Sequence, residues 1–140
     1  MADSMREIAS ALLFDSTGRF LFQQRDNIEG ITEPGKIGLF GGHKEANETF
    51  LECISREVSE EISINLPLER FQPLTVYAGI DLEIGGPIRA EFFVARNISI
   101  AQVRITEGCL VVAEAEKIPR LGGRLTAYAR LALKAFGIDA

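Results

Sequence analysis

The 140-residue sequence contains little of what several common classes of protein require. Its two cysteines, Cys53 and Cys109, are too few for a disulfide framework and lack metal-site spacing, so we expect reduced thiols that serve packing. No apolar run approaches the roughly 18–20 residues that cross a bilayer. The first residues, MADSMREIAS, do not form a charged-then-apolar leader. We therefore expect a cytoplasmic protein that does not associate with membranes.

Charge and hydropathy narrow the range of partners. The net charge of −5 argues against a nucleic-acid polymer as a partner. An acidic protein can still bind an anionic small molecule if metal ions bridge the charges. Hydrophobic residues make up 46% of the chain and no low-complexity run interrupts it, so we expect a folded chain with a single domain over residues 1–140.

Hydrophobic periodicity and turn signals predict strands followed by a helix, further strands and a final helix. The predicted strands cover residues 8–14, 19–25, 39–40, 71–82, 88–95 and 109–113, and the first two form a hairpin. The predicted helices begin at residue 49 and at residue 124, the second ending at residue 136. Loops at residues 26–38 and 81–89 are long enough to shape a pocket. This order of elements indicates an α+β fold.

The segment 42–64 contains the residues that indicate most about the function of the chain. Thr49 followed by Glu52 is a capping-box pattern, which predicts a helix start. At about 100° per residue, one stripe of the helix is apolar and should be buried. Its members are Leu51, Ile54, Val58 and Ile62.

Three carboxylates, Glu57, Glu60 and Glu61, project from a neighbouring face of this helix and repel one another. Arg56 can offset only part of that repulsion. Carboxylate-rich sites suit Mg²⁺ or Mn²⁺, and Mg²⁺ commonly sits between one or two carboxylates and substrate phosphates. An acidic run is usually a solvated helix face. The preceding glycine pair at 41–42, where the backbone turns sharply or approaches another group, weighs against that simpler interpretation.

The segment from Gly42 to Ile64 resembles the Nudix box, G-x5-E-x7-R-E-U-x-E-E-x-G-U, in which U is a bulky aliphatic residue. Every specified position matches except one, where Ser63 replaces glycine near the helix C-terminus. Glycine there adopts a left-handed backbone cheaply, so serine should cost about 1 kcal/mol or shift the turn. Asn47, at a position where many members have glycine, tolerates a left-handed backbone. Residues 34–40 resemble the usual lead-in to the box.

The resemblance implies an α/β/α sandwich with a mixed β-sheet between helices. It also implies hydrolysis of a nucleoside diphosphate linked to another group, by attack of water at phosphorus with Mg²⁺, or Mn²⁺, as cofactor. Glu57 and Glu61 resemble the principal metal ligands, with Glu60 as a further ligand or as the base. The carbonyl of Gly42 often completes such a metal site. The residues that resemble the pair orienting the ligand helix are Glu48 and Arg56.

Other residues are candidates on the substrate side. Glu107 could supply one more carboxylate as ligand or base, although a surface turn glutamate is the simpler interpretation. Arg25 could pair with a phosphate. Phe40 could stack on a base, although strand aromatics are more often core, and the same holds for Phe92 and Tyr77. His43 could touch a phosphate, and Glu45 could face the metal site, but both also suit an exposed loop.

Two other functions stay open. A binding module of this fold could sense a nucleotide without turnover, although the intact box carboxylates argue against it. An isomerase of isoprenoid diphosphates would need an additional nucleophile or acid, such as Cys53 or Cys109. The sequence leaves open the identity of the nucleotide derivative, from triphosphates and damaged nucleotides to nucleotide sugars, dinucleoside polyphosphates and ADP-ribose. It also leaves a homodimer open.

Overall fold

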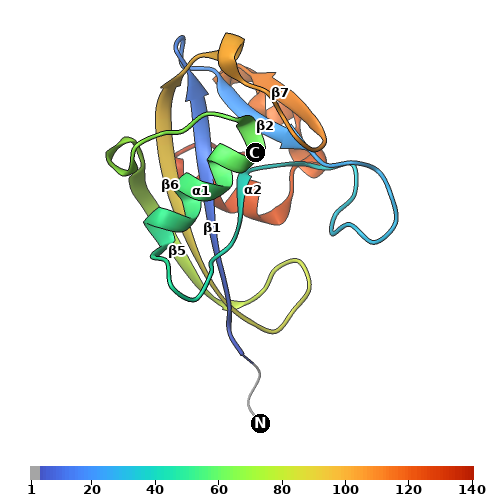
Figure 1. Ribbon diagram of the computed structural model, residues 1–140. Coiled ribbons are helices and arrows are strands. Elements are labelled where there is room, and N and C mark those ends of the chain that lie inside the picture. Colours follow the sequence, from blue (N-terminus) through green and yellow to red (C-terminus); the bar gives the residue numbers. More distant parts are fainter. Residues whose placement is uncertain (1–3) are drawn as a thin grey trace.

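The computed structural model describes residues 4–140, in which a mixed β-sheet lies between two helices (Figure 1). Residues 1–3, on which the expectation about an N-terminal leader partly rests, lie outside the described residues. The strands are β1 (Arg6–Asp15), β2 (Phe20–Gln24), β3 (Ile37–Gly38), β4 (Phe40–His43), β5 (Gln72–Ile80), β6 (Pro87–Ile98) and β7 (Cys109–Ala113). The long helices are α1 (Phe50–Ile62) and α2 (Ala127–Phe136).

Strand β1 lies at the centre of the sheet, whose order is β3-β2-β1-β6-β5. Its partners β2 and β4 are antiparallel to it, whereas β6 runs parallel. Strand β7 pairs with β2, and β5 forms an antiparallel hairpin with β6. The predicted hairpin of the first two strands is therefore confirmed. Because helices cover both faces, successive residues of β1 are buried on alternate sides, as the two-residue period of a strand requires.

Two apolar clusters fill the layers between the sheet and the helices, and Figure 1 shows α1 on the near face and α2 on the far face. The α1-side cluster contains Ala9, Ala11, Leu13, Phe40, Ile54, Val58, Ile62 and Phe93 among its buried residues. The α2-side cluster contains Leu12, Phe14, Phe22, Phe92, Tyr128, Ala132 and Leu133 among its members. The arrangement is the α/β/α sandwich with a mixed sheet that the resemblance implied.

Helix α1 begins and ends as the sequence predicts. Thr49 Oγ1 accepts from the Glu52 amide at 3.0 Å, and Glu52 Oε1 accepts from the Thr49 amide at 2.8 Å, which completes the capping box. The helix ends at Ser63, which adopts a left-handed backbone with φ of 62°. Ser63 Oγ donates to the Arg104 carbonyl at 3.0 Å, and this bond helps to hold a conformation that glycine would adopt without strain. Three of the four stripe residues are fully buried, and Leu51 is half-buried.

Most predicted boundaries are displaced by one to three residues, including the start of α2 and the strand around Phe40. Helix α2 begins after residue 126 rather than at 124, because Thr126 Oγ1 caps it by accepting from the Ala129 amide at 3.2 Å. The predicted strand at 39–40 is replaced by β3 and β4, separated by Leu39. Short 3₁₀ helices connect the other elements, namely η1 (Leu68–Arg70), η2 (Ile100–Gln102), η3 (Ala115–Arg120) and η4 (Gly122–Arg124). In the part of the chain that the structure describes, no helix has the length and apolarity to span a bilayer.

Candidate active site

The glycine pair of β4, Gly41 and Gly42, lies between strand β1 and helix α1. In the antiparallel pairing of β4 with β1, Gly42 lies opposite Ala9 and Gly41 opposite Ser10. On the helix side, a Cβ added to Gly42 would stand 2.5 Å from the carboxyl carbon of Glu57. The absence of a side chain at Gly42 therefore lets the Glu57 carboxyl lie directly against the β4 backbone.

Arg56 organises the carboxylates along the exposed side of α1. Its Nη2 and Nε donate to the two oxygens of Glu48 at 2.7 and 3.0 Å, so the predicted ion pair is confirmed and is bidentate. Its Nη1 donates to Glu57 at 3.1 Å and to Glu60 at 3.3 Å. The bonds from Arg56 and from the Glu45 amide lower the pKa of Glu48 to about 2, so this carboxylate is ionised at neutral pH.

Glu61 faces the sheet and is half-buried. Its Oε1 accepts from the Gly41 amide at 2.8 Å. Burial raises the pKa of Glu61 to about 8, against the effect of that bond, and the charges of Glu57, Glu107 and Glu60 raise it further. Burial also raises the pKa of Glu57, although Arg56 opposes the shift. Both carboxyls thus lie where a nearby cation would stabilise their ionised form.

The donor set fits a hard divalent cation. Glu57, Glu60, Glu61 and the Gly42 carbonyl offer only oxygen, which Mg²⁺ and Mn²⁺ prefer. Within residues 4–140, no three side chains of histidine, cysteine, aspartate or glutamate converge closely enough to enclose an ion in these rotamers. Mg²⁺ does not require such a cage, since it usually keeps several waters and takes one or two carboxylates together with substrate phosphates.

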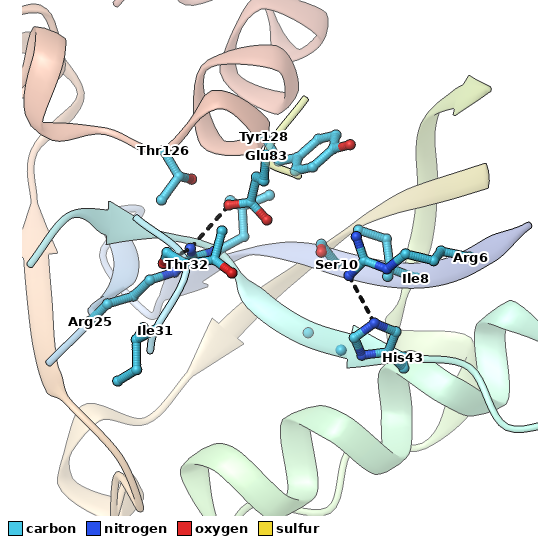
Figure 2. A pocket seen from close by; sticks show the side chains of 13 residues that line it. Arg6, Ile8, Ser10, Arg25, Ile31, Thr32, His43, Glu83, Thr126 and Tyr128 are labelled. Atoms are coloured by element: carbon cyan, nitrogen blue, oxygen red, sulfur yellow. Dashed lines mark hydrogen bonds and ion pairs between the residues drawn. The ribbon is translucent and has the colours of Figure 1, made fainter. Parts of the chain in front are cut away.

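A cavity of about 310 Å³ opens beside the glycine pair (Figure 2). It is lined by Arg6, Ile8, Ser10, Arg25, Ile31, Thr32, Leu39, Gly41, Gly42, His43, Glu83, Thr126 and Tyr128. Arg25 lies in this cavity, where its Nη1 donates to the Thr32 carbonyl at 2.6 Å and pairs with Glu83 at 3.0 Å. His43 lies on the opposite side, with its Nε2 2.8 Å from Arg6 Nη2 (Figure 2). Burial and the charge of Arg6 lower the pKa of His43.

The remaining acidic candidates are near the box. The charge of Glu107 contributes to the raised pKa of Glu61, so its loop approaches α1, and the Glu107 carbonyl accepts from Gln23 Nε2 at 2.8 Å. Glu45 is exposed and stands 3.9 Å from Arg56 Nε. The functions of Glu107 and Glu45 stay predictions.

Two expectations about aromatic and thiol side chains were wrong. Phe40 is completely buried between α1 and the sheet, so its ring cannot stack on a base. Phe92 is buried in the opposite core, as expected of a strand aromatic. Cys109 is exposed rather than packed, whereas Cys53 is buried as expected and neither forms a disulfide. Burial raises the pKa of Cys53 to about 12, which leaves its thiol protonated and unsuited to the nucleophile of an isomerase.

Several cavity residues had no signal in the sequence. Glu83 lies in the predicted loop 81–89, and Tyr128 and Thr126 lie in the predicted second helix, but none belongs to a motif. Arg6 forms an ion pair with the buried Asp81, which joins the first strand to the β5–β6 turn. The pairing of β1 with β6 and of β6 with β5 brings Arg6 beside Asp81, and α2 supplies Tyr128.

Comparisons with known proteins agree with this geometry. A model of the NUDIX domain matches residues 5–116. The chain therefore belongs to the NUDIX domain family, and it is a Nudix pyrophosphohydrolase. The MutT NUDIX hydrolase from Burkholderia pseudomallei is similar in structure, with a TM-score of 0.77 and 26% identity, over 95% of this chain and 98% of that one. A search of curated protein sequences found no match.

Two further solved structures share the fold. The MutT protein from Methanosarcina mazei Go1 has a TM-score of 0.73 and 24% identity, with coverage of 97% of this chain and 95% of that one. A bifunctional NMN adenylyltransferase/ADP ribose pyrophosphatase from Francisella tularensis, complexed with AMP and a Mn ion, has a TM-score of 0.70 and 19% identity, over 90% of this chain and 39% of that chain. Nudix hydrolases generally use divalent metals and act on small nucleotide derivatives.

Proposed function

We propose that this chain hydrolyses the pyrophosphate linkage of a nucleoside diphosphate derivative with Mg²⁺, or Mn²⁺ in its place. The observation that carries the proposal is the position of Glu57 and Glu61, which flank the Gly41–Gly42 backbone at the edge of the cavity. A substrate in the cavity would thus have its phosphates beside two carboxylates of α1 whose pKa values are raised. Burial of these carboxylates without a full set of cationic partners supports a bound divalent ion.

The residues would divide the work as follows. Glu57, Glu61 and the Gly42 carbonyl would hold the ion, with Glu60 as a further ligand or as the base. When bound, the ion would neutralise phosphate oxygens and position the attacking water. Arg56, held by both oxygens of Glu48, would keep Glu57 oriented.

The reaction breaks one bond and forms one. The oxygen of water bonds to a phosphorus of the diphosphate, and the bridging P–O bond breaks to release a phosphate or a phosphorylated group. The proton lost by water passes to a carboxylate. Glu60 is the candidate within the box, because 59% of its side chain is exposed, and Glu107 is the candidate from the neighbouring loop.

The purified protein with a panel of nucleotide derivatives would test the proposal. Nucleoside triphosphates, nucleotide sugars, dinucleoside polyphosphates and ADP-ribose would each be incubated with Mg²⁺, with Mn²⁺ and with a chelator. We expect turnover of at least one class, as released monophosphate, phosphate or pyrophosphate, that the chelator abolishes. Turnover that survives the chelator would reject the metal requirement. Binding without turnover for every compound would favour the nucleotide-sensing module instead.

Replacement of Arg56 by lysine should weaken metal binding although the charge is kept. Lysine cannot form the two-point contact with Glu48, and the loss of an orienting partner typically costs about 10- to 100-fold in metal affinity or activity. The Mg²⁺ concentration for half-maximal rate would measure the effect. Arg120→Lys, at an exposed position in η3, is the matched control. An unchanged metal requirement in Arg56→Lys would contradict the orienting role.

Replacement of Gly42 by alanine should disturb the Glu57 carboxyl directly. The new Cβ would stand 2.5 Å from that carboxyl carbon, so the side chain must move. A displacement of about 1 Å at a catalytic centre can cost about 100-fold, and we expect a loss of that order in kcat/KM. Gly123→Ala is the control, because a Cβ there meets no atom within 4 Å. Activity within twofold of the parent in Gly42→Ala would show that the close approach is not needed.

A further inference from the structure

Two loops outside the Nudix box close one end of the cavity. Arg25, just after β2, reaches the carbonyl of Thr32 in the first loop and the carboxyl of Glu83 in the β5–β6 turn. Figure 2 shows Arg25 and Glu83 joined above β1, with His43 at the other side of the cavity. A ligand with its diphosphate beside Gly42 could therefore extend toward Glu83 within the same cavity. The volume of about 310 Å³ is at the lower end of typical ligand sites.

Glu83 is largely buried beside another acidic side chain, an arrangement that costs free energy when both groups are ionised. Its side chain is 12% exposed and lies against a second carboxyl, that of Glu33. Burial raises the pKa of Glu83, and the contact with Glu33 raises it further. Glu33 itself has a left-handed backbone with φ of 47°, which is unfavourable for a residue with a side chain. Strained residues and paired acids of this kind cluster at functional sites.

Two other polar side chains at this end of the cavity are already engaged. The Tyr128 hydroxyl donates to Asp81 at 2.9 Å and accepts from the Leu82 amide at 3.0 Å. Thr126 Oγ1 accepts from the Ala129 amide. Among the described residues that line the cavity, Glu83 alone carries a carboxyl. One of its oxygens pairs with Arg25, the other points away from Arg25 (Figure 2), and the carboxyl also contacts that of Glu33.

We propose that Glu83 selects the substrate by accepting a hydrogen bond from the exocyclic amino group of its nucleobase. The chain would then prefer nucleotides of amino-bearing bases, such as adenine and cytosine, to those with an oxo group at the same ring position. A carboxylate accepts well from such an amino group. An oxo group would set an acceptor against the carboxyl oxygen and leave both groups unpaired. The proposal rests on the proposed function, since it assumes a nucleotide in this cavity.

Binding of nucleoside monophosphates tests the proposal without requiring turnover. AMP is compared with IMP, and CMP with UMP, because each pair differs at the ring position that carries the amino or the oxo group. Calorimetry in the presence of Mg²⁺ would give each Kd. A hydrogen bond to a charged group corresponds to about 10- to 100-fold in affinity. We expect the amino-bearing member of at least one pair to bind at least about tenfold more tightly, in line with that range.

Variants of Glu83 locate the effect. In Glu83→Ala, and in Glu83→Met, which keeps more of the side-chain volume, the ratio within the pair should fall to within about twofold, since no acceptor remains. Glu116→Ala, at an exposed position in η3, should keep the parental ratio. Thermal unfolding would verify that each variant is folded.

The proposal would be overturned if AMP did not bind more tightly than IMP and CMP did not bind more tightly than UMP. A preference that persists in both Glu83 variants would also overturn it. These outcomes are separate from the test of hydrolysis. Turnover without a base preference would reject the role of Glu83 and keep the proposed function. A base preference in binding without turnover of any compound would keep the role of Glu83 and reject the proposed function.

Discussion

Replacement of Glu57 by glutamine is expected to lower kcat/KM for pyrophosphate hydrolysis by about 10³-fold. Glutamine matches the size of glutamate, so it fits against Gly42 and can still accept from Arg56. It removes the negative charge of the carboxylate that we propose as a metal ligand. Metal-centred stabilisation of transition-state charge is worth several kcal/mol, and about 1.4 kcal/mol corresponds to a factor of ten in rate.

Steady-state kinetics at saturating Mg²⁺, with the substrate class found in the panel, would measure this loss. Glu116→Gln is the control, since the same chemical change at an exposed position should leave the rate within about twofold. Thermal unfolding would show whether Glu57→Gln is as well folded as the parent. A folded Glu57→Gln protein that retains more than a tenth of the parental kcat/KM would contradict the assignment of Glu57 as a metal ligand.

Replacement of Glu61 by glutamine is expected to abolish most of the activity and, without metal, to stabilise the fold. The pKa of Glu61 is raised from 4.5 to about 8, so ionisation of this carboxyl opposes folding. As the pH rises from about 4.5 to about 8, the parent should lose stability relative to Glu61→Gln, with no further change above pH 8. At pH 7 the difference should reach about 3 kcal/mol. Glutamine can still accept from the Gly41 amide.

Urea unfolding in a chelator, at several pH values between 4 and 9, would measure this difference. Addition of Mg²⁺ should then stabilise the parent more than the variant, because bound metal favours the ionised carboxylate. Glu116→Gln should show no such dependence on pH, as its side chain is exposed. If the difference in unfolding free energy between the parent and Glu61→Gln stays constant across this pH range, ionisation of Glu61 does not oppose folding. A gain in stability together with a loss of activity would be an example of the trade-off between stability and activity at an active site.

Features that depend on nearby residues could be predicted from the sequence. The capping box of Thr49 and Glu52 and the buried stripe of α1 follow from the 3.6-residue period, which places residues on a helix face whatever surrounds it. The pairing of Arg56 with Glu48 was implied by the resemblance to the Nudix box and is present. The hairpin of β1 and β2 followed from a turn signal between two apolar runs.

Features that depend on contacts between residues far apart in the sequence could not be predicted from it. Phe40 lies in a strand beside two glycines, and only the packing of α1 over β4 shows that its ring faces the core rather than the cavity. The pairing of Arg25 with Glu83 joins residues 58 positions apart in a loop and a turn that no periodic pattern describes. By itself the sequence therefore determined which side chains share a face of α1, because that placement rests on spacing along one helix. Only the tertiary structure decided what lines the cavity, because its walls come from elements that lie far apart in the sequence.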